Sequence, residues 1–411
     1  MNQSPTYLTR IFATENPIAR CLIETRALRG FADGLVAVAL ASYLIAIGLG
    51  ARQVGMVTTA TLVGSAAATI GLGMIAGRWP GRQMLLGAAL LMILTGLGFL
   101  VVQDVWLLIP VAFIGTMNPS NGDVSVFLPL EQAGIAGEVS GASRTSVFAR
   151  YSLGANLAAS LGALAAGGIA TVVANRGMAA ERTGQIGFLV YTLIGVIVFL
   201  RLQGLPRAET INIEKRARSG LHQSRAIVTK MAVVFSLDSL GGGFVVQTML
   251  ILWLHQRHGM TEAAAGLLFA VSSLLAAFSM LVAAPMARRI GLVNTMVFTH
   301  LPANIFLILT PFMPTMGLAV TMLLGRALLS SMDVPARTAF VMAAVQPDER
   351  PAAASYTNVP RSLASAVSPA LAGQLLSMTA FGWPLVIGGV LKASYDLILL
   401  GMFRSVQIDP D

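Results

Sequence analysis

Long apolar runs separated by short polar segments dominate the chain. About twelve of these runs reach the roughly 20 mostly apolar residues that a helix needs to cross a bilayer core. The expected helices lie near 28–49, 54–77, 83–103, 106–130, 143–173 and 184–203 in the first half, and near 229–256, 262–287, 291–311, 317–345, 352–378 and 382–404 in the second. Polar residues interrupt the fourth, fifth, tenth and eleventh runs. The pattern predicts an all-α membrane protein.

The longest polar segment between apolar runs divides the chain near its middle. We therefore expect an N-terminal six-helix bundle over 1–203, a cytoplasmic linker over 204–228 and a C-terminal six-helix bundle over 229–411. Weak matches at one common spacing join the halves: Arg78 with Arg289, Glu138 with Glu349, and Arg150 with Arg361. Such parallel repeats generate two bundles related by an axis along the membrane normal.

Composition agrees with this reading. Charged residues make up 11% of the chain and hydrophobic residues 55%, whereas a soluble domain carries about 25% charged residues. The net charge of +9 could suggest nucleic acid, but the basic residues lie mainly in short gaps between apolar runs and form no stripe with aromatic neighbours. No nucleic-acid partner is expected.

The basic residues predict the orientation of the helices. If the N-terminus is cytoplasmic and the sides alternate, the outer side receives only Arg52, Arg176, Arg182 and Arg257. That asymmetry follows the positive-inside rule. It predicts an even number of helices, both termini in the cytoplasm, and a place in the plasma (cell inner) membrane. The first 20 residues lack the apolar core of a cleaved signal, and the single cysteine, Cys21, reads as a small apolar filler.

Two loops carry a family resemblance. The first half reads Gly73-Met-Ile-Ala-Gly77-Arg78-Trp-Pro-Gly81-Arg82, and the second reads Pro285-Met-Ala-Arg288-Arg289-Ile-Gly291-Leu292. Both resemble the G-x-L-A-D-R-x-G-R-R loop of the major facilitator superfamily (MFS). The resemblance implies the MFS fold, with a gating role for Gly73, Arg78, Gly81, Arg82, Arg288, Arg289 and Gly291 in the cytoplasmic loops. Gly77 and Arg288 replace the family's acid, so the latch attributed to that acid is not expected here.

The fifth run contains a series of glycines: Gly154, Gly162, Gly167 and Gly168. It resembles a degenerate form of the family's antiporter motif, with Ala163 where a proline is expected. Small residues also simply allow helices to pack closely.

Ionisable residues inside apolar runs are costly and are functional hypotheses by default. Asp33, in the first run, is a candidate proton or cation site, or else it pairs with Arg29. Asp238 is its rough counterpart in the second half. Three glycines follow Asp238 and would loosen the helix, either for gating and close substrate approach or for tight packing.

The fourth and tenth runs are unusually polar. In the fourth, Asn118, Asn121 and Asp123 surround a proline and either line a cavity or mark the end of the span. In the tenth, Arg326 is expected to pair with Asp333 or with a substrate carboxylate.

Three further sets of residues are expected to be structural. Lys392 and Asp396 lie four residues apart on the last helix and should form an internal pair. His300 and Asn304 have the same spacing and favour a hydrogen-bonded structural role over a proton relay. Near the cytoplasmic ends, Arg150 and Arg361 are expected to pair with Glu138 and Glu349 respectively.

These features favour a secondary active transporter that moves a small organic solute by alternating access, as proton-coupled efflux through Asp33 or Asp123. A proton symporter or facilitator for uptake of a small organic anion or nutrient is the alternative. The hypothesis from a different functional class is a membrane sensor or scaffold that transports nothing. The chain lacks HExxH, GxSxG and phosphate-loop motifs, so neither an enzyme nor a metal or other cofactor is expected. The expected partners are the solute, a coupling proton and the lipid bilayer, with the protein a monomer.

Overall fold

A computed structural model describes residues 16–75, 79–118, 125–138, 142–205, 221, 223–346 and 349–404, and its regular elements over these residues are helices. The first half contains α2 (Pro17–Ala46), α3 (Ala51–Ile75), α4 (Gly81–Val101), α5 (Val105–Ile114), α6 (Phe127–Glu138), α7 (Ala142–Asn175) and α8 (Glu181–Gln203). The second contains α9 (Arg225–Phe244), α10 (Gln247–His258), α11 (Glu262–Ile290), α12 (Leu292–Leu309), η1 (Thr310–Phe312), α13 (Met316–Ser330), α14 (Asp333–Ala343), α15 (Arg350–Met378) and α16 (Trp383–Phe403).

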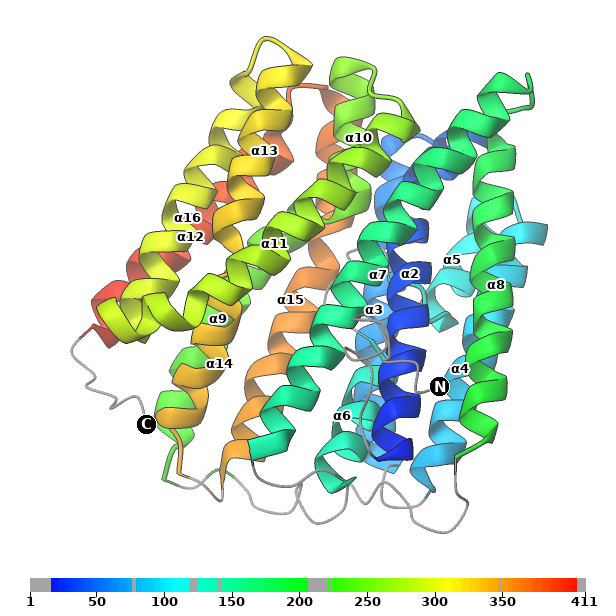
Figure 1. The fold of residues 1–411 in the computed structure, drawn as a ribbon. Helices are drawn as coiled ribbons and strands as arrows, with labels where there is room; N and C mark the ends of the chain where they lie inside the picture. Colours follow the sequence, from blue (N-terminus) through cyan, green and yellow to red (C-terminus); the bar gives the residue numbers. More distant parts are fainter. Residues whose placement is uncertain are drawn as a thin grey trace, which may run out of the picture.

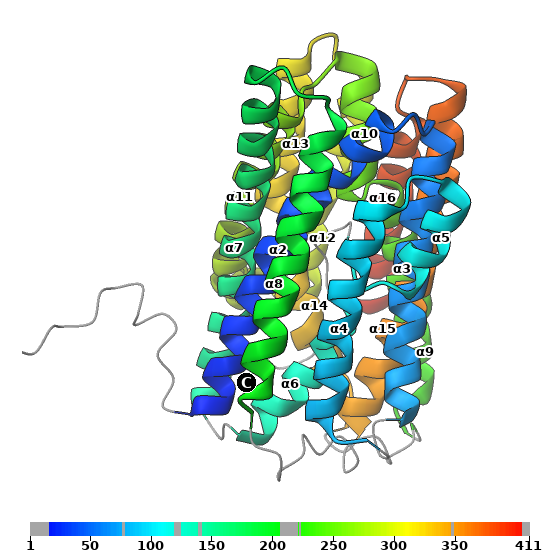
Figure 2. The ribbon, with the colours of Figure 1, turned by 90° about the vertical axis from the view of Figure 1, so that its right-hand side faces the viewer.

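The helices form two bundles that stand side by side (Figures 1 and 2). In the first bundle α2 packs against α7 and α8, and α4 against α8. In the second, α9 packs against α15 and α16, and α12 against α16, α13 and α14. The start of α2 lies at the bottom of Figure 1, and α16 ends at its lower left, toward the same end of the molecule. We call this end the terminal face and the other end the opposite face.

The outer surface of the bundles is apolar, as contact with lipid requires. Within the described residues, ten spans are long and apolar enough to cross a membrane by length and composition, with α9–α10 and α13–α14 each counted as one span. Large apolar side chains on several of them are strongly exposed, among them Leu94 (53%), Leu161 (59%) and Phe278 (57%). Of the other two expected runs, 106–130 is divided between α5 and α6, and 352–378 becomes the 29-residue α15, which is less apolar.

The first helix begins earlier than expected, at Pro17 and not near residue 28. The Asn16 side chain accepts hydrogen bonds from the backbone N–H groups of Ile18 and Ala19, and proline is favoured at the first helical position. The expected start near residue 28 was based on apolar length alone. The helix in fact begins about three turns earlier, in a more polar section capped by Asn16.

Three spans are broken near their middle. The fourth span divides into α5 and α6, and the tenth into α13 and α14. The seventh divides into α9 and α10 directly after Gly241–Gly243. A Cβ on Gly243 would lie 2.1 Å from the Ser365 carbonyl oxygen of α15, and one on Gly241 would lie 2.7 Å from that of Gly388 on α16. The glycines therefore allow tight packing beside the break.

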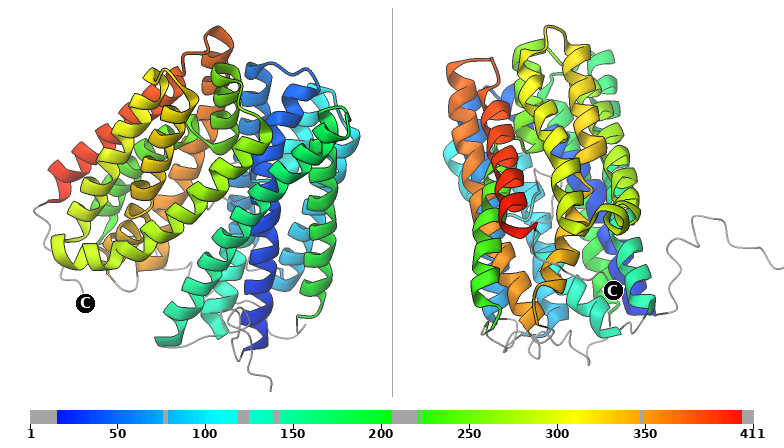
Figure 3. Two further views of the ribbon diagram at one scale, coloured as in Figure 1. Left: turned by 45° about the horizontal axis from the view of Figure 1, so that its top comes forward. Right: turned by 90° about the vertical axis from the view of Figure 1, so that its left-hand side faces the viewer.

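The two bundles approach each other most closely toward the opposite face. A Cβ on Gly55 of α3 would lie 2.4 Å from the Pro369 carbonyl oxygen of α15, and the backbone N–H of Ala370 donates to Thr59 Oγ1 at 2.8 Å. Gly266 of α11 meets Ala163 of α7 in the same way, at 2.5 Å. From these contacts the bundles diverge toward the terminal face (Figure 3, left).

The loops after the second span of each half lie at the terminal face. Arg82 donates to the Gln203 carbonyl oxygen at 2.7 Å, which ties the start of α4 to the end of α8, and Gly81 is the first residue of α4. Arg288 and Arg289 are exposed in the last turn of α11, and Gly291 has φ +85°, a conformation that favours glycine. Gly73 lies in α3, but its surroundings and those of Arg78 are outside the described residues.

Candidate functional site

A cluster of buried charged and polar side chains fills the middle of the second bundle. We call it the charge cluster. Its members come from four helices: Asp238 of α9, His300 and Asn304 of α12, Asp333 and Arg337 of α14, and Lys392 and Asp396 of α16. Each is at most 8% exposed.

Asp238 is the centre of the cluster. Lys392 donates from Nζ to its Oδ1 at 2.5 Å, and Arg337 donates to its Oδ2 at 3.1 Å. Arg337 also lies 3.3 Å from Asp333, one helical turn away. The Asp238 carboxylate therefore joins α9 to α16 and α14, because one of its oxygens binds Lys392 and the other binds Arg337.

Asp396 is held by an imidazole and an amide. Its Oδ1 lies 2.9 Å from His300 Nδ1, and its Oδ2 accepts from Asn304 Nδ2 at 2.8 Å. The other ring nitrogen of His300 is 3.8 Å from Asp238 Oδ1. The imidazole thus stands between two carboxylates, and His300 and Asn304 have the hydrogen-bonded role that their spacing predicts.

Two expected pairs are replaced by others. Lys392 of α16 pairs with Asp238 of α9 and not with Asp396 on its own helix. Helical spacing places two residues on one face, but it cannot show that another helix brings a nearer partner, and the expected Lys392–Asp396 pair was wrong for that reason. Asp333 pairs with Arg337 on its own helix and not with Arg326 of α13, so for Arg326 the alternative, a substrate carboxylate, stays a prediction.

Glu349, just before α15 at the terminal face, does not form the expected pair with Arg361. Glu349 accepts hydrogen bonds from the backbone N–H groups of Gln223 and Ser224 at 3.0 and 2.9 Å, just before α9 begins. Arg361 instead donates to Ser239 and Asn358. The Glu138 side chain lies outside the described residues.

The first bundle contains a smaller buried ion pair between α2 and α6. Arg29 donates to Glu131, which is also the acceptor for Tyr151 Oη at 2.6 Å. The Arg29 guanidinium lies 3.9 Å from the centre of the Phe127 ring. The sequence did not predict this pair, because Glu131 lies just after the expected fourth run and Tyr151 lies inside the fifth, and neither position shows by itself that α2 packs between them.

Asp33 differs from the other buried acids. It is 7% exposed in the middle of α2. No hydrogen bond or ion pair joins it to another described residue, and Arg29, its expected alternative partner, is engaged by Glu131. Every other buried Asp or Glu among the described residues has a donor or cation within hydrogen-bond distance: Glu131, Asp238, Asp333, Glu349 and Asp396.

Arg326 is a cation that, like Asp33, has no ion-pair partner among the described residues. It is partly buried near the end of the apolar part of α13, and its Nε is enclosed without an acceptor. No ion pair joins it to a described acid, and a guanidinium of this kind donates readily to a carboxylate or phosphate.

The fourth span is described only at its ends. Asn118 is buried, at 3% exposed, in the break after α5. Asn121 and Asp123 lie outside the described residues, so the choice between a cavity wall and a loop remains a prediction.

The family emerges from comparison with known proteins. The family model of the Major Facilitator Superfamily matches residues 25–324 and 231–406. The chain belongs to this superfamily. It is therefore a membrane transporter of a solute, and the two-bundle fold expected from the sequence is confirmed.

The MFS chain has a curated relative in yeast and several solved structural neighbours. It is 25% identical over 414 residues to the uncharacterized membrane protein YJR124C of Saccharomyces cerevisiae, covering 92% of each. Its fold is similar to the nucleoside transporter NupG, with a TM-score of 0.70, 14% identity, and 94% and 99% of the two chains covered. A bacterial homologue of the human lysosomal transporter Spinster, solved inward-facing and occupied, gives 0.71 at 14% identity with 100% of both chains covered. These two structures show the shared fold.

Proposed function

We propose that this MFS protein is a secondary active transporter that couples a proton to a small organic solute through Asp33. The observation that carries the proposal is that Asp33 alone among the described buried acids has no partner. A charged group at mid-membrane is costly, and a proton from solution can neutralise Asp33 without breaking an existing pair. Arg26, Arg29, Glu131 and Tyr191 are its charged and titratable neighbours.

Alternating access supplies the transport cycle. Close contacts at Gly55 and Gly266 bring the bundles together toward the opposite face, and the bundles diverge toward the terminal face, which supports a closed opposite side. With the terminal face in the cytoplasm, as the basic residues predict, this arrangement is inward-facing. Rocking of the bundles about their centre would then expose Asp33 and Arg326 to each side in turn.

Arg326 favours an anionic solute. Arginine binds carboxylates and phosphates through paired donors, and Arg326 has no acid of the described chain to occupy it. Entry of the proton together with the anion would make the protein an importer. Exchange of the two would make it the efflux antiporter that the glycine series predicts. The direction of proton flux relative to the solute separates these possibilities.

The test is solute-dependent proton movement in proteoliposomes with a pH-sensitive dye trapped inside. Organic anions, lipophilic cations and sugars are supplied in turn to wild type, Asp33→Asn and Asp104→Asn. Asp104 is an exposed cap that accepts from the N–H groups of Trp106 and Leu107. Asparagine caps helices equally well, so this variant is a matched control.

We expect an organic anion to drive proton flux in wild type and in Asp104→Asn. Asp33→Asn should lose that flux while it still exchanges labelled solute across the membrane without net transport. Proton flux of wild-type size in Asp33→Asn would contradict the assignment. Solute movement without proton flux in wild type would show a facilitator.

A further inference from the structure

A groove of about 1050 Å³ runs along the outer surface of the second bundle, away from the charge cluster. It lies between α9 and α16, with Ala364 of α15 in its wall. Three apolar side chains that line the groove are strongly exposed: Val233 at 67%, and Ile398 and Met402 at 41% each. Because these positions fall within membrane-spanning helices, the groove opens toward lipid.

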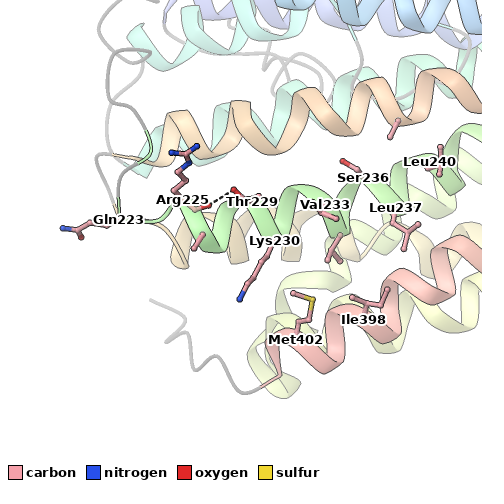
Figure 4. A pocket seen from close by; sticks show the side chains of 13 residues that line it. Gln223, Arg225, Thr229, Lys230, Val233, Ser236, Leu237, Leu240, Ile398 and Met402 are labelled. Atoms are coloured by element: carbon pink, nitrogen blue, oxygen red, sulfur yellow. Dashed lines mark hydrogen bonds between the residues drawn. The ribbon is translucent and has the colours of Figure 1, made fainter.

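The groove has a polar end and an apolar end (Figure 4). Arg225 and Lys230 lie toward the terminal face, whereas Leu237, Leu240 and Ile398 lie deeper along the same groove. From Arg225 to Leu240 a helix rises about 22 Å at 1.5 Å per residue. One leaflet with its headgroups is also about 20–22 Å thick. The groove therefore matches one lipid molecule in length and in polarity.

The two cations are available to a ligand. Arg225 and Lys230 are exposed, and neither forms an ion pair with a described acid. Glu349, an acid at this end of the bundle, accepts hydrogen bonds from the backbone N–H groups of Gln223 and Ser224. A phosphate that meets Arg225 and Lys230 would therefore displace no existing ion pair.

We propose that this groove binds one anionic phospholipid of the surrounding bilayer. The headgroup phosphate contacts Lys230, which points toward α16, while Arg225 on the other side of α9 adds positive charge at the same end of the groove. An acyl chain lies along Val233, Leu237 and Ile398. Charge favours this occupant over the segment before α9, whose Lys215, Arg216 and Arg218 would repel the groove's cations. The residues after α16 carry Asp409 and Asp411 and are the competing occupant that the experiment tests.

The bound lipid would support the packing of α9 and α16, two of the four helices that hold the charge cluster. The inner sides of α9 and α16 are joined by the 2.5 Å contact of Lys392 with Asp238, and the groove separates the outer sides of the same helices. Anionic lipid should therefore raise the thermal stability of the protein more than zwitterionic lipid does.

The experiment measures lipid retention on the purified full chain by native mass spectrometry, with phosphatidylglycerol and phosphatidylcholine as probes. Wild type should retain one phosphatidylglycerol and release phosphatidylcholine. Arg225→Gln with Lys230→Gln should bind phosphatidylglycerol about 30-fold more weakly, since each basic residue at a membrane surface contributes about five-fold. The control, Arg288→Gln with Arg289→Gln, removes the same charge from exposed positions of the same face and should bind as wild type does.

A second pair of variants tests the apolar part of the groove without a change in charge. Val233→Trp should fill the groove and release the lipid, whereas Leu94→Trp, at an exposed position of α4, should not. Thermal stability in phosphatidylcholine confirms that all variants fold. Three results would overturn the proposal. The first is equally weakened phosphatidylglycerol binding in the Arg225/Lys230 variant and in the Arg288/Arg289 control. The others are wild-type binding by Val233→Trp, and lipid retention that appears only when the chain is truncated after Arg404. The last would identify the acidic C-terminal segment as the occupant.

Discussion

Removing the charge of Asp238 should destabilise the second bundle strongly. Asp238→Asn keeps the shape of the side chain and leaves two buried cations without that carboxylate. Arg337 still has Asp333 at 3.3 Å, but Lys392 loses its 2.5 Å partner. Breaking a buried pair in this way costs about 3–5 kcal/mol, which is more than 100-fold in the unfolding equilibrium constant.

Removing both partners should restore most of that stability. Lys392→Met retains the apolar stem of the lysine and discards its ammonium group. The double variant Asp238→Asn with Lys392→Met therefore buries no uncompensated charge, and we expect it to lie within about 2 kcal/mol of wild type. With Lys392→Met as the second single variant, the coupling energy of the cycle should then be at least about 1 kcal/mol, within the range found for residues in one network.

The assay is reversible unfolding of the purified protein by sodium dodecyl sulfate in mixed micelles, followed by circular dichroism. Asp104→Asn, which changes an exposed acid to an equally good cap, should unfold as wild type does. The reasoning would be refuted by Asp238→Asn as stable as wild type, or by a double variant as unstable as Asp238→Asn. Either result would mean that Lys392 does not depend on the Asp238 charge.

Two further predictions concern transport. Gly55→Ala places a Cβ 2.4 Å from the Pro369 carbonyl oxygen, so closure of the opposite face should weaken by about 1–3 kcal/mol and steady-state transport should fall. The control, Gly87→Ala, adds a Cβ that meets nothing within 4 Å and should transport normally. Equal transport rates for the two variants would argue against the Gly55 contact as a seal. Arg326→Gln should raise the KM for an anionic solute about 10- to 150-fold, because a hydrogen bond to a charged group contributes about 1.5–3 kcal/mol. The exposed Arg52→Gln is the control in the same proteoliposome uptake assay, and an unchanged KM for Arg326→Gln would remove Arg326 from the solute site.

The sequence by itself determined the fold class. Charged residues are too few to cover a soluble protein, and the apolar runs have the length of a bilayer, so helices across a membrane were the remaining solution. The polar residues inside the fourth and tenth runs and the glycines after Asp238 also marked places where the helices break. Local chemistry decides such features, because a helix depends on bonds between residues four apart.

Partners between helices were decided only by the tertiary structure. Asp33, Asp238 and Arg326 could be named as costly buried charges from the sequence, but their surroundings could not. Lys392 found Asp238 in place of the acid one turn away, and Arg29 found Glu131 in place of Asp33. The physical reason is that helical spacing fixes which residues share a face, whereas the distance between two charges on different helices depends on how the helices pack. Packing joined some of these groups, and it left Asp33 and Arg326 without an ion-pair partner among the residues that the structure describes.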